Sequence, residues 1–324
     1  MDALVITAPG EIEAGTYPDP EPGPGEVLVE LRAAALNHRD LYVLDGRFAG
    51  REPPLVPGSD GAGVRADTGE EVVVFPSLAW GDREEAPGPD FRILGVPDQG
   101  THAQLIAVPE ENLCPKPQRF SWAEAAAFPL AGLTAYRGLF YRAHLHADDT
   151  VLVLGAGGGV ASFAVQLACQ LGARVLVTSS SEEKIEAARS LGADGGVLYT
   201  EPDWPDRVRE LTGGRGADVI LDSVGSTWPD SLRALRLGGR LVVFGSTGGS
   251  DVQLSARDVY FGQWSLLGTT MGSPDDFHGL LRMIDAGSWR PVVDSVRPLA
   301  EGPAAYERLR SGEQTGKLVL EIAS

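Results

Sequence analysis

The sequence predicts an α/β protein in which a domain built on a doubly wound parallel sheet is joined to a β-rich domain. With 324 residues, the chain exceeds the usual size of a single hydrophobic core. Between residues 151 and 246, apolar runs typical of buried strands alternate with helical stretches, as in a parallel sheet with crossover helices. The first ~115 residues are instead rich in Gly and Pro and contain short β-type runs such as EVLVELRAAAL.

Local signals predict the helices and strands of the α/β region. Ser121 is the expected N-cap of an Ala-rich helix, and Glu124 stands at the capping-box position. Strands are then expected at 151–155, 174–179, 195–199, 218–224 and 240–246, and helices near 159–171, 181–191, 203–212 and 228–236. After Trp264 the sequence predicts one more strand, a helix near 275–286 and a terminal strand in GKLVLEI.

Charge and cysteine content exclude several classes of protein. The 27 basic and 45 acidic residues give a formal charge of −18, which argues against nucleic acid or an anionic membrane as partner. The stretch 151–178 carries one charge, but its glycine cluster indicates a buried strand, loop and helix rather than a membrane span. Cys114 and Cys169 are too few for a disulfide scaffold, and the N-terminus lacks the pattern of a secretory signal. We therefore expect a cytoplasmic protein.

The stretch VLVLGAGGGV, residues 151–160, indicates a dinucleotide-binding loop. Starting G-x-G-x-x-G at Gly155 leaves Val160 in the last glycine position, whereas starting at Ala156 puts Gly158 and Ala161 in the second and third. A small residue in the third position lets helix and strand pack closely, and the backbone N–H groups can approach a pyrophosphate. The predicted cofactor contacts are Gly157, Gly158, Gly159 and Val160; the alternative is an ordinary glycine-rich turn.

The tip of the second strand favours NADPH over NADH. An NAD site usually carries Asp or Glu there for the ribose 2′-hydroxyl, but this sequence has Ser179 and Ser180, with Lys184 one helical turn later. Hydroxyl donors and a positive charge suit a 2′-phosphate, which a carboxylate would repel. Glu182 and Glu183 weaken the argument, although on a helix they can point away from Lys184.

Several motifs in a fixed order carry a family resemblance. They are GSDGAGV, AFPLAGLTAYRGL, VLVLGAGGGVASFAVQLA, LGAD, GADVILDSVG and GKLVLEI. Together they resemble the medium-chain dehydrogenase/reductase superfamily over nearly the whole chain, and most of all the branch of quinone oxidoreductases and proteins called zinc-binding dehydrogenases. The resemblance implies a Rossmann dinucleotide-binding domain at 121–266 and a GroES-like catalytic domain at 1–120 and 267–324.

The positions that hold catalytic zinc in metal-dependent members of this family lack strong ligands here. They correspond to Asn37, Ser59 and Leu130, and leucine has no donor atom while neutral amide and hydroxyl groups bind zinc poorly. Residues 76–100, where a structural zinc lobe would lie, contain no cysteine. His144 and His146 are spaced so that their side chains diverge on a helix. We expect no zinc.

Hydride chemistry without a metal favours an acceptor that spreads the resulting charge, such as a quinone or another α,β-unsaturated carbonyl. The protein then has to orient the acceptor and offer hydrogen-bond donors to the developing oxyanion. The resemblance implies Asn37 and Tyr42 as those donors and places Thr134 beside the nicotinamide. Turn capping and core packing are the alternatives for Asn37 and Tyr42. Asp40 is expected to hold local structure, and the role of His38 stays open.

The resemblance and the strand ends supply the remaining cofactor contacts. Tyr199, which closes the third strand, resembles a residue that flanks the 2′-phosphate in NADPH-binding relatives, and Lys317 resembles a lysine directed towards the cofactor phosphates. Further contacts are expected at strand ends, where a doubly wound sheet binds its ligand: Ser223, Val224, Gly225, Phe244, Gly245, Ser246, Thr269 and Met271.

The leading hypothesis is thus a zinc-independent, NADPH-dependent reductase of a small-molecule quinone or conjugated carbonyl. An enoyl-thioester reductase, a zinc-type alcohol dehydrogenase and a non-catalytic NADPH-binding sensor are the alternatives. The resemblance also implies a homodimer or homotetramer that assembles through the edge of the cofactor-domain sheet near WSLLGTT.

Overall fold

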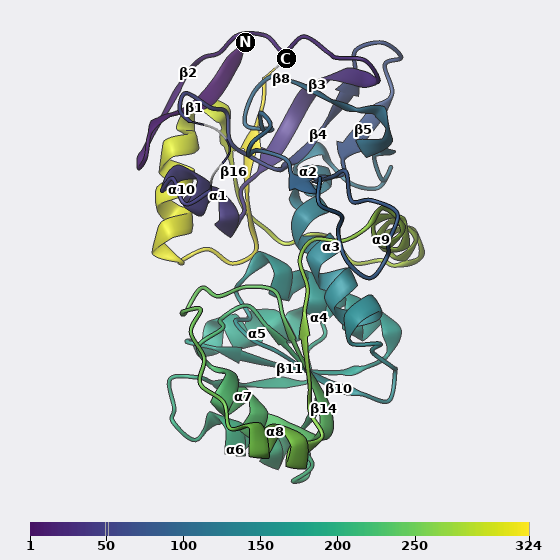
Figure 1. The fold of residues 1–324 in the computed structure, drawn as a ribbon, viewed down its shortest axis with the longest axis vertical. Helices are drawn as coiled ribbons and strands as arrows, with labels where there is room; N and C mark the ends of the chain where they lie inside the picture. The colour runs from purple at the N-terminus through teal and green to yellow at the C-terminus, as the bar shows by residue number, and fades with distance from the viewer. Residues whose placement is uncertain (49, 51, 324) are drawn as a thin grey trace. The chain divides into compact units, whose positions relative to one another are not determined.

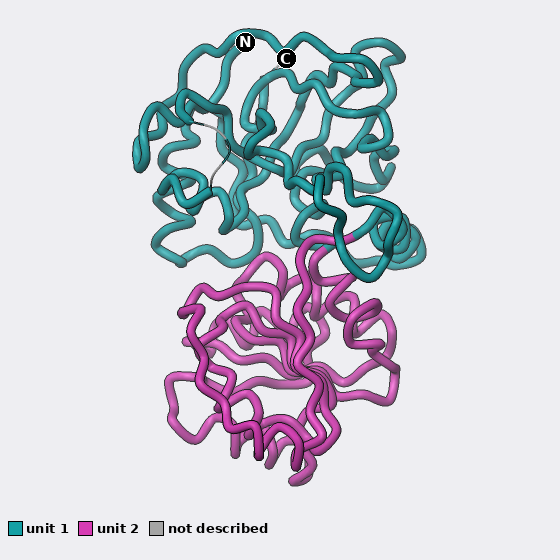
Figure 2. Tube along the Cα trace, viewed as in Figure 1, with its two compact units in different colours: residues 1–133, 273–324 teal, residues 134–272 magenta. Residues whose placement is uncertain are grey.

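The chain divides into two compact units, shown in different colours in Figure 2. The computed structural model describes residues 1–48, 50 and 52–323. Unit 1 comprises Met1–Leu133 and Ser273–Ser324, and unit 2 comprises Thr134–Gly272. These bounds differ from the predicted division at 121 and 266. The first boundary lies later because helix α2 (Trp122–Ala127) packs against strands β3 (Glu26–Ala35) and β4 (Asp60–Arg65) of unit 1.

Unit 2 is built on a six-stranded parallel sheet, which confirms the predicted doubly wound architecture. Its strand order is β12-β11-β10-β13-β14-β15. The strands are β10 (Thr150–Val153), β11 (Arg174–Ser179), β12 (Gly195–Leu198), β13 (Ala217–Asp222), β14 (Leu235–Val243) and β15 (Ser265–Gly268). The chain builds outward from β10 in one direction and then restarts at β13 in the other, so the order reverses between β10 and β13.

Helices connect these strands as the sequence predicts, with two differences. The connecting helices are α4 (Gly159–Leu171), α5 (Glu182–Ser190), α6 (Trp204–Leu211), α7 (Trp228–Ala234) and α8 (Ala256–Gly262), while α3 (Pro129–Tyr136) and a π-helical segment at Arg137–Arg142 precede the first strand of the sheet. Helix α8 was not predicted, and β14 begins at Leu235 rather than at residue 240. The predicted N-cap at Ser121 is confirmed at the start of α2, where its hydroxyl accepts a hydrogen bond from the Glu124 N–H.

Unit 1 contains a seven-stranded sheet in which the end of the chain returns to the N-terminal strands. Its path is β16-β17-β3-β4-β5-β9, and β8 also pairs with β3. The remaining strands are β5 (Glu71–Val74), β8 (Leu105–Pro109), β9 (Leu113–Pro115), β16 (Val293–Pro298) and β17 (Lys317–Glu321), with separate pairs β1–β2 (Asp2–Ala8, Glu11–Thr16) and β6–β7 (Ser77–Leu78, Arg92–Ile93). Figure 1 shows the C-terminal segment in yellow within this purple-to-blue unit.

Strand register brings three distant parts of the chain to one end of the unit 1 sheet. Ala35, the last residue of β3, pairs with Asp60 on β4 and with Val319 on β17. The chain then turns at Asn37 into helix α1 (His38–Leu44). Residues 37, 60 and 317 therefore meet, although they are far apart in sequence.

The other helices of unit 1 are α9 (Pro274–Ala286), which was predicted, and α10 (Gly302–Ser311), which was not. Helix α10 packs its Tyr306 and Leu309 into a buried cluster with Leu4, Leu36 and Leu320. No helix among the described residues is both long and apolar enough to cross a membrane.

Candidate active site

The predicted cofactor contacts of unit 2 gather at one edge of its sheet. Because all six strands are parallel, their carboxyl ends lie on the same side, and a doubly wound fold binds its ligand there, at the point where the strand order reverses. The residues are placed as follows: Gly157–Val160 after β10, Ser179 and Ser180 at the end of β11, Tyr199 after β12, Ser223–Gly225 after β13, Phe244–Ser246 after β14, and Thr269 and Met271 after β15.

The glycine loop leads directly into the N-terminus of α4. Gly155 has φ +77°, a conformation that favours glycine, and Gly158 is the N-cap residue. A Cβ atom added to Gly157 would lie 2.8 Å from Lys184 Cδ and 3.3 Å from its Nζ. The Lys184 side chain therefore crosses the loop at Gly157, and its ammonium group lies beside the helix N-terminus that attracts anions.

The tip of β11 carries hydroxyl groups and no carboxylate. Ser179 is buried, and its Oγ accepts a hydrogen bond from the Ser181 N–H at 3.3 Å, whereas Ser180 is exposed. Tyr199, at the end of the neighbouring strand, is 49% exposed and free to cover a ligand. The candidates for contact with a 2′-phosphate are therefore Ser180, Lys184 and Tyr199. The Ser179 hydroxyl instead accepts the hydrogen bond from Ser181 at the start of α5.

Asp222 shapes the loop after β13, and the sequence reasoning missed it. It is fully buried, and its Oδ1 accepts hydrogen bonds from the N–H groups of Val224 at 2.6 Å and Gly225 at 3.2 Å. Burial raises the pKa of Asp222, while these N–H donors oppose the rise. A Cβ on Gly225, which has φ +84°, would lie 2.4 Å from Gly249 O, so this loop packs directly on the loop after β14. The sequence could have indicated this role, because Asp222 stands at the end of the apolar run VIL.

These features fit a nicotinamide dinucleotide. Backbone-lined loops stand at the switch point of the sheet, a lysine lies over the glycine loop, and Gly225 packs so closely on Gly249 O that no larger side chain fits there. The residues that would hold the cofactor are those at the strand ends and Lys184.

In unit 1, Asn37 begins helix α1 as its N-cap residue and forms a capping box with Asp40. The Asn37 side chain also has two partners outside that helix. Its Nδ2 donates to Asp60 Oδ2 at 2.8 Å, and its Oδ1 accepts from Lys317 Nζ at 2.5 Å. Lys317 also donates to Asp60 Oδ2 at 2.9 Å. We call Asn37, Asp60 and Lys317 the unit 1 polar cluster.

The carboxylate of Asp60 organises this cluster. It is fully buried, and it accepts three hydrogen bonds, the third from the Leu130 N–H to Oδ1 at 2.7 Å in the first turn of α3. Burial raises the pKa of Asp60, while Lys317 and Asn37 oppose the rise. Because lysine can only donate and a carboxylate can only accept, the orientation of the Asn37 amide is dictated by its two partners.

The sequence assigned Lys317 to the cofactor phosphates, but its side chain is 3% exposed and its contacts lie within unit 1. Neither Asp60 nor this placement of Lys317 was foreseen. The motif GSDG could have indicated the role of Asp60, because it places a carboxylate between small residues in an apolar strand.

Tyr42 and Thr134, the other predicted catalytic residues, lie on helices. Tyr42 is half-buried on α1, with its ring edge-on to His38 at 6.3 Å between centroids and the Arg47 guanidinium 5.0 Å from its own centroid. Thr134 is buried on α3 and is the first residue of unit 2. Asp40 accepts from the Asn37 N–H at 2.7 Å, so it holds the start of α1 as expected.

The positions that correspond to zinc ligands are engaged in other contacts. Both ends of the Asn37 amide are occupied, and Ser59 Oγ accepts from Arg39 Nη1 at 2.6 Å while donating to Leu94 O at 2.7 Å. A guanidinium on one candidate ligand and an ammonium on another would repel a dication. Among the described residues, no three His, Cys, Asp or Glu side chains form a group able to hold a metal. These residues do not fit zinc.

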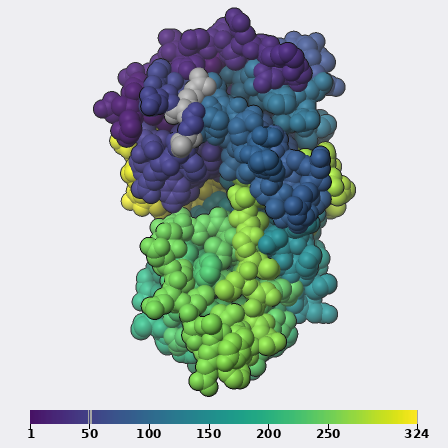
Figure 3. Space-filling model, viewed as in Figure 1, coloured from purple at the N-terminus to yellow at the C-terminus, as the bar shows by residue number. Residues whose placement is uncertain are grey.

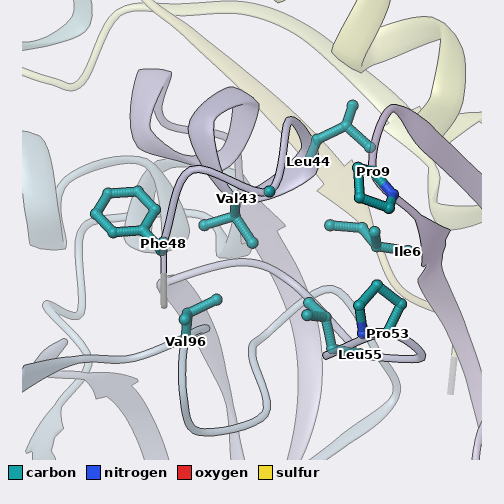
Figure 4. A pocket seen from close by; sticks show the side chains of 9 residues that line it. Ile6, Pro9, Val43, Leu44, Phe48, Pro53, Leu55 and Val96 are labelled. Atoms are coloured by element: carbon teal, nitrogen blue, oxygen red, sulfur yellow. The ribbon is translucent and has the colours of Figure 1, made fainter. Parts of the chain in front are cut away.

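A small apolar pocket also lies in unit 1, beside α1 (Figure 4). Its cavity of about 30 Å³ is the size of a water molecule or a methyl group, not of a substrate. It is lined by Ile6, Pro9, Val43, Leu44, Gly46, Phe48, Pro53, Leu55 and Val96. With no polar side chain to orient a ligand, the pocket is a gap in the packing.

Comparison with known proteins gives the family. Residues 23–118 match the alcohol dehydrogenase GroES-like domain, and residues 159–286 match the zinc-binding dehydrogenase model. A zinc-type alcohol dehydrogenase-like protein of Schizosaccharomyces pombe is 35% identical over 317 residues, covering 92% of this chain and 91% of that protein. A quinone oxidoreductase of Pseudomonas aeruginosa is 34% identical over 323 residues, covering 96% of each.

A solved structure of an NAD-dependent alcohol dehydrogenase superposes with a TM-score of 0.93 at 39% identity, covering 100% of both chains. Relatives named for quinone reduction and for alcohol oxidation thus share this fold over its full length. The chain, with its GroES-like unit and its Rossmann unit, belongs to the medium-chain dehydrogenase/reductase superfamily and is an oxidoreductase of that type.

Proposed function

We propose that this chain is an NADPH-dependent, zinc-independent reductase that transfers hydride to a quinone or another α,β-unsaturated carbonyl. The observation that carries the proposal is the engagement of Asn37 and Ser59 in contacts with Lys317, Asp60 and Arg39. Alcohol oxidation needs a group that stabilises an alkoxide, and zinc is the group that does so in metal-dependent members of the family. A conjugated acceptor delocalises its negative charge and needs only hydrogen-bond donors.

The residues of the chain have three tasks in this reaction. The nicotinamide supplies the hydride. The strand-end loops of unit 2 hold and orient the cofactor, with Asp222 fixing the backbone of Ser223–Gly225. Asn37 retains one amide hydrogen beyond the one that it gives to Asp60, and we assign it to the acceptor oxygen, where negative charge develops. Tyr42 supplies a second donor, its hydroxyl group, or forms a wall of the substrate site.

NADPH is proposed over NADH because the tip of β11 offers hydroxyls and Lys184 lies over the glycine loop. The main alternative is a preference for NADH, because a similar solved structure is that of an NAD-dependent alcohol dehydrogenase. Measurement of Kd for both cofactors by quenching of tryptophan fluorescence separates the two. Tighter binding of NADH would contradict the assignment.

A substrate panel tests the reaction class. Purified protein is assayed with NADPH against 1,4-benzoquinone, a cyclic enone and crotonyl-CoA, and with NADP⁺ against primary and secondary alcohols. We expect turnover of the quinone or the enone without added metal. Turnover of alcohols alone would support the zinc-type alternative, preference for the thioester would support an enoyl-thioester reductase, and NADPH binding without any turnover would support a sensor.

We also propose a homodimer formed through the free edge of β15. This strand ends the unit 2 sheet, and its Leu266 is exposed together with Tyr260 and Phe261 of α8. Figure 3 shows the segment that contains α8 and β15, in light green, on the face of unit 2 in view. An exposed sheet edge with apolar side chains is a template for pairing with a second chain. Because both cysteines are free thiols, the proposed location is the cytoplasm.

A further inference from the structure

Two hydrogens in the unit 1 polar cluster have no acceptor among the described residues. The Asn37 amide carries two N–H hydrogens, and one of them goes to Asp60. The Lys317 ammonium carries three, of which one goes to Asn37 Oδ1 and one to Asp60 Oδ2. One hydrogen on each nitrogen is therefore left for a ligand.

These two donors are neighbours. Asn37 Nδ2 and Lys317 Nζ bond the same oxygen, Asp60 Oδ2, at 2.8 and 2.9 Å, and Lys317 also bonds the amide oxygen of Asn37 at 2.5 Å. Asn37 is 6% exposed and Lys317 3%, so both residues are almost entirely removed from bulk water. A positive charge with so little water around it interacts strongly with a nearby anion.

We propose that Lys317 and Asn37 together form an oxyanion-binding site in which Lys317 supplies the positive charge for catalysis, and that Asp60 is the positioning residue for both. This inference rests on the proposed function and extends it, since it adds a cation to the single amide donor.

The reaction at this site is balanced as follows. A C–H bond of the reduced nicotinamide breaks as hydride leaves, and a new bond to hydrogen forms on the acceptor. The acceptor's π electrons move to its carbonyl oxygen, which becomes an oxyanion and accepts hydrogen bonds from Lys317 and Asn37. A proton from solvent then neutralises that oxygen, so that the carbonyl compound is reduced by two electrons.

Asp60 determines whether this arrangement persists. Its Oδ2 holds both nitrogens, and its Oδ1 is anchored by the Leu130 N–H of α3. Without this carboxylate, Lys317 would be a buried cation without its charged partner, and the Asn37 amide would be free to rotate. The contribution of Asp60 is therefore orientation, and it does not need to touch the substrate.

The first test measures ionisation of a bound phenol and needs no turnover. 4-Nitrophenol resembles the reduced product of a quinone, and its phenolate absorbs in the visible. We expect the protein to bind it as phenolate, with the bound phenol's pKa about one unit or more below its value in water. Lys317→Met should abolish this lowering, and Lys317→Arg, which keeps the charge, should restore part of it.

The other two lysines of the chain provide matched controls. Lys116 is also buried, but it bonds Glu71 at 3.0 Å and Phe120 O at 3.0 Å, so Lys116→Met tests the general effect of removing a buried lysine. Lys184→Met should weaken NADPH binding and leave phenol ionisation unchanged. Lys317→Met should do the reverse, whereas a lysine that binds cofactor phosphate would behave like Lys184.

Steady-state kinetics give the second test. With the best acceptor of the panel, Lys317→Met should lower kcat by about 100-fold, the typical effect of losing one oxyanion donor, with little change in the Kd for NADPH. Should Lys317→Met not fold, Asn37→Ala keeps the test open, because it removes the second donor and leaves the ion pair in place.

Binding of the phenol only in its neutral form, no binding at all, or equal ionisation in wild type and Lys317→Met would overturn the inference. The proposed function fails separately, if no quinone or enone is reduced. Lys317-dependent phenolate binding by a protein that reduces neither class would keep the oxyanion site and reject the substrate assignment.

Discussion

The two polar sites of this molecule are built in opposite ways. In unit 2, short loops after parallel strands present backbone groups, and the candidate cofactor contact Lys184 lies in the first turn of the helix that follows β11. In unit 1, three side chains from the ends of β3, β4 and β17 meet in a buried cluster with two charges. The first kind of site depends on local conformation, while the second depends on strand register across the whole chain.

The largest effect should come from breaking the unit 1 polar cluster. Asp60→Ala removes the partner of a buried ammonium, so we expect the free energy of unfolding to fall by about 3–5 kcal/mol in urea titrations. Asp67→Ala is the control, since its ion pair with Arg65 lies on the surface and its removal should leave the free energy of unfolding almost unchanged. Similar losses in both variants would mean that Asp60 does not hold a buried cluster.

This contrast explains which parts could be predicted from the sequence. The strands and helices between residues 151 and 236 followed from apolar runs and caps, because burial on both faces of a parallel sheet leaves an unambiguous pattern. β16 and α10 were missed, since VDSVRP is half polar and GPAAYERLRS begins with residues that usually mark a turn. Pro303 is tolerated there because the first helical turn needs no N–H donor.

The candidate site divides in the same way. Gly157, Lys184 and the strand-end loops could be located from motifs read along a single stretch of chain. The partnership of Lys317 with Asn37 spans 280 residues, and only the pairing of β17 with β3 brings them together. Sequence reasoning named both residues but did not foresee their contact, because a lysine in TGKL gives no indication of which strand β17 pairs with.

Acid should affect unit 1 through His102, which is fully buried and within 3.1 Å of the Tyr306 hydroxyl. Burial lowers the pKa of His102 to about 4, so between pH 6.5 and 4 the unfolded chain binds the proton more readily. The free energy of unfolding that the neutral His102 contributes is present in full above pH 6.5. It falls by roughly 3 kcal/mol as the pH falls towards 4.

The measurement is urea unfolding at a series of pH values. Replacing both partners, as His102→Phe with Tyr306→Phe, leaves neither with an unmatched polar group and should flatten the profile in this window. A profile as steep as that of the wild type would show that other groups cause the acid sensitivity.

A smaller effect is expected at the local site of unit 2. Lys184→Gln should raise the Kd for NADPH by about 10–100-fold, the value of a charge-assisted hydrogen bond, and leave the Kd for NADH nearly unchanged. Lys184→Glu should reverse the preference. The free energy of unfolding should not change in either variant, since this site is made of accessible loops. An equal loss of affinity for NADPH and NADH would mean that Lys184 contacts a part of the cofactor that both share, and not the 2′-phosphate.

The smallest effect on activity and stability is expected for a variant that alters only the oligomeric state and leaves both polar sites intact. Leu266→Lys places a charge on the free edge of the unit 2 sheet, so we expect the mass measured by light scattering to shift from dimer to monomer. Leu211→Lys is the control, because Leu211 is a similarly exposed leucine at the end of α6, and this substitution should not alter the mass. An unchanged mass for Leu266→Lys would exclude β15 as the interface.

We propose that a lysine and an asparagine, and not a metal, stabilise the oxyanion in this enzyme. The most direct test is the rate of NADPH-dependent reduction of the best quinone or enone after dialysis against a chelator, with zinc measured in the same sample. We expect an unchanged rate at far less than one zinc per chain, and loss of this rate in Lys317→Met. A rate that falls with chelation and returns on addition of zinc would contradict it.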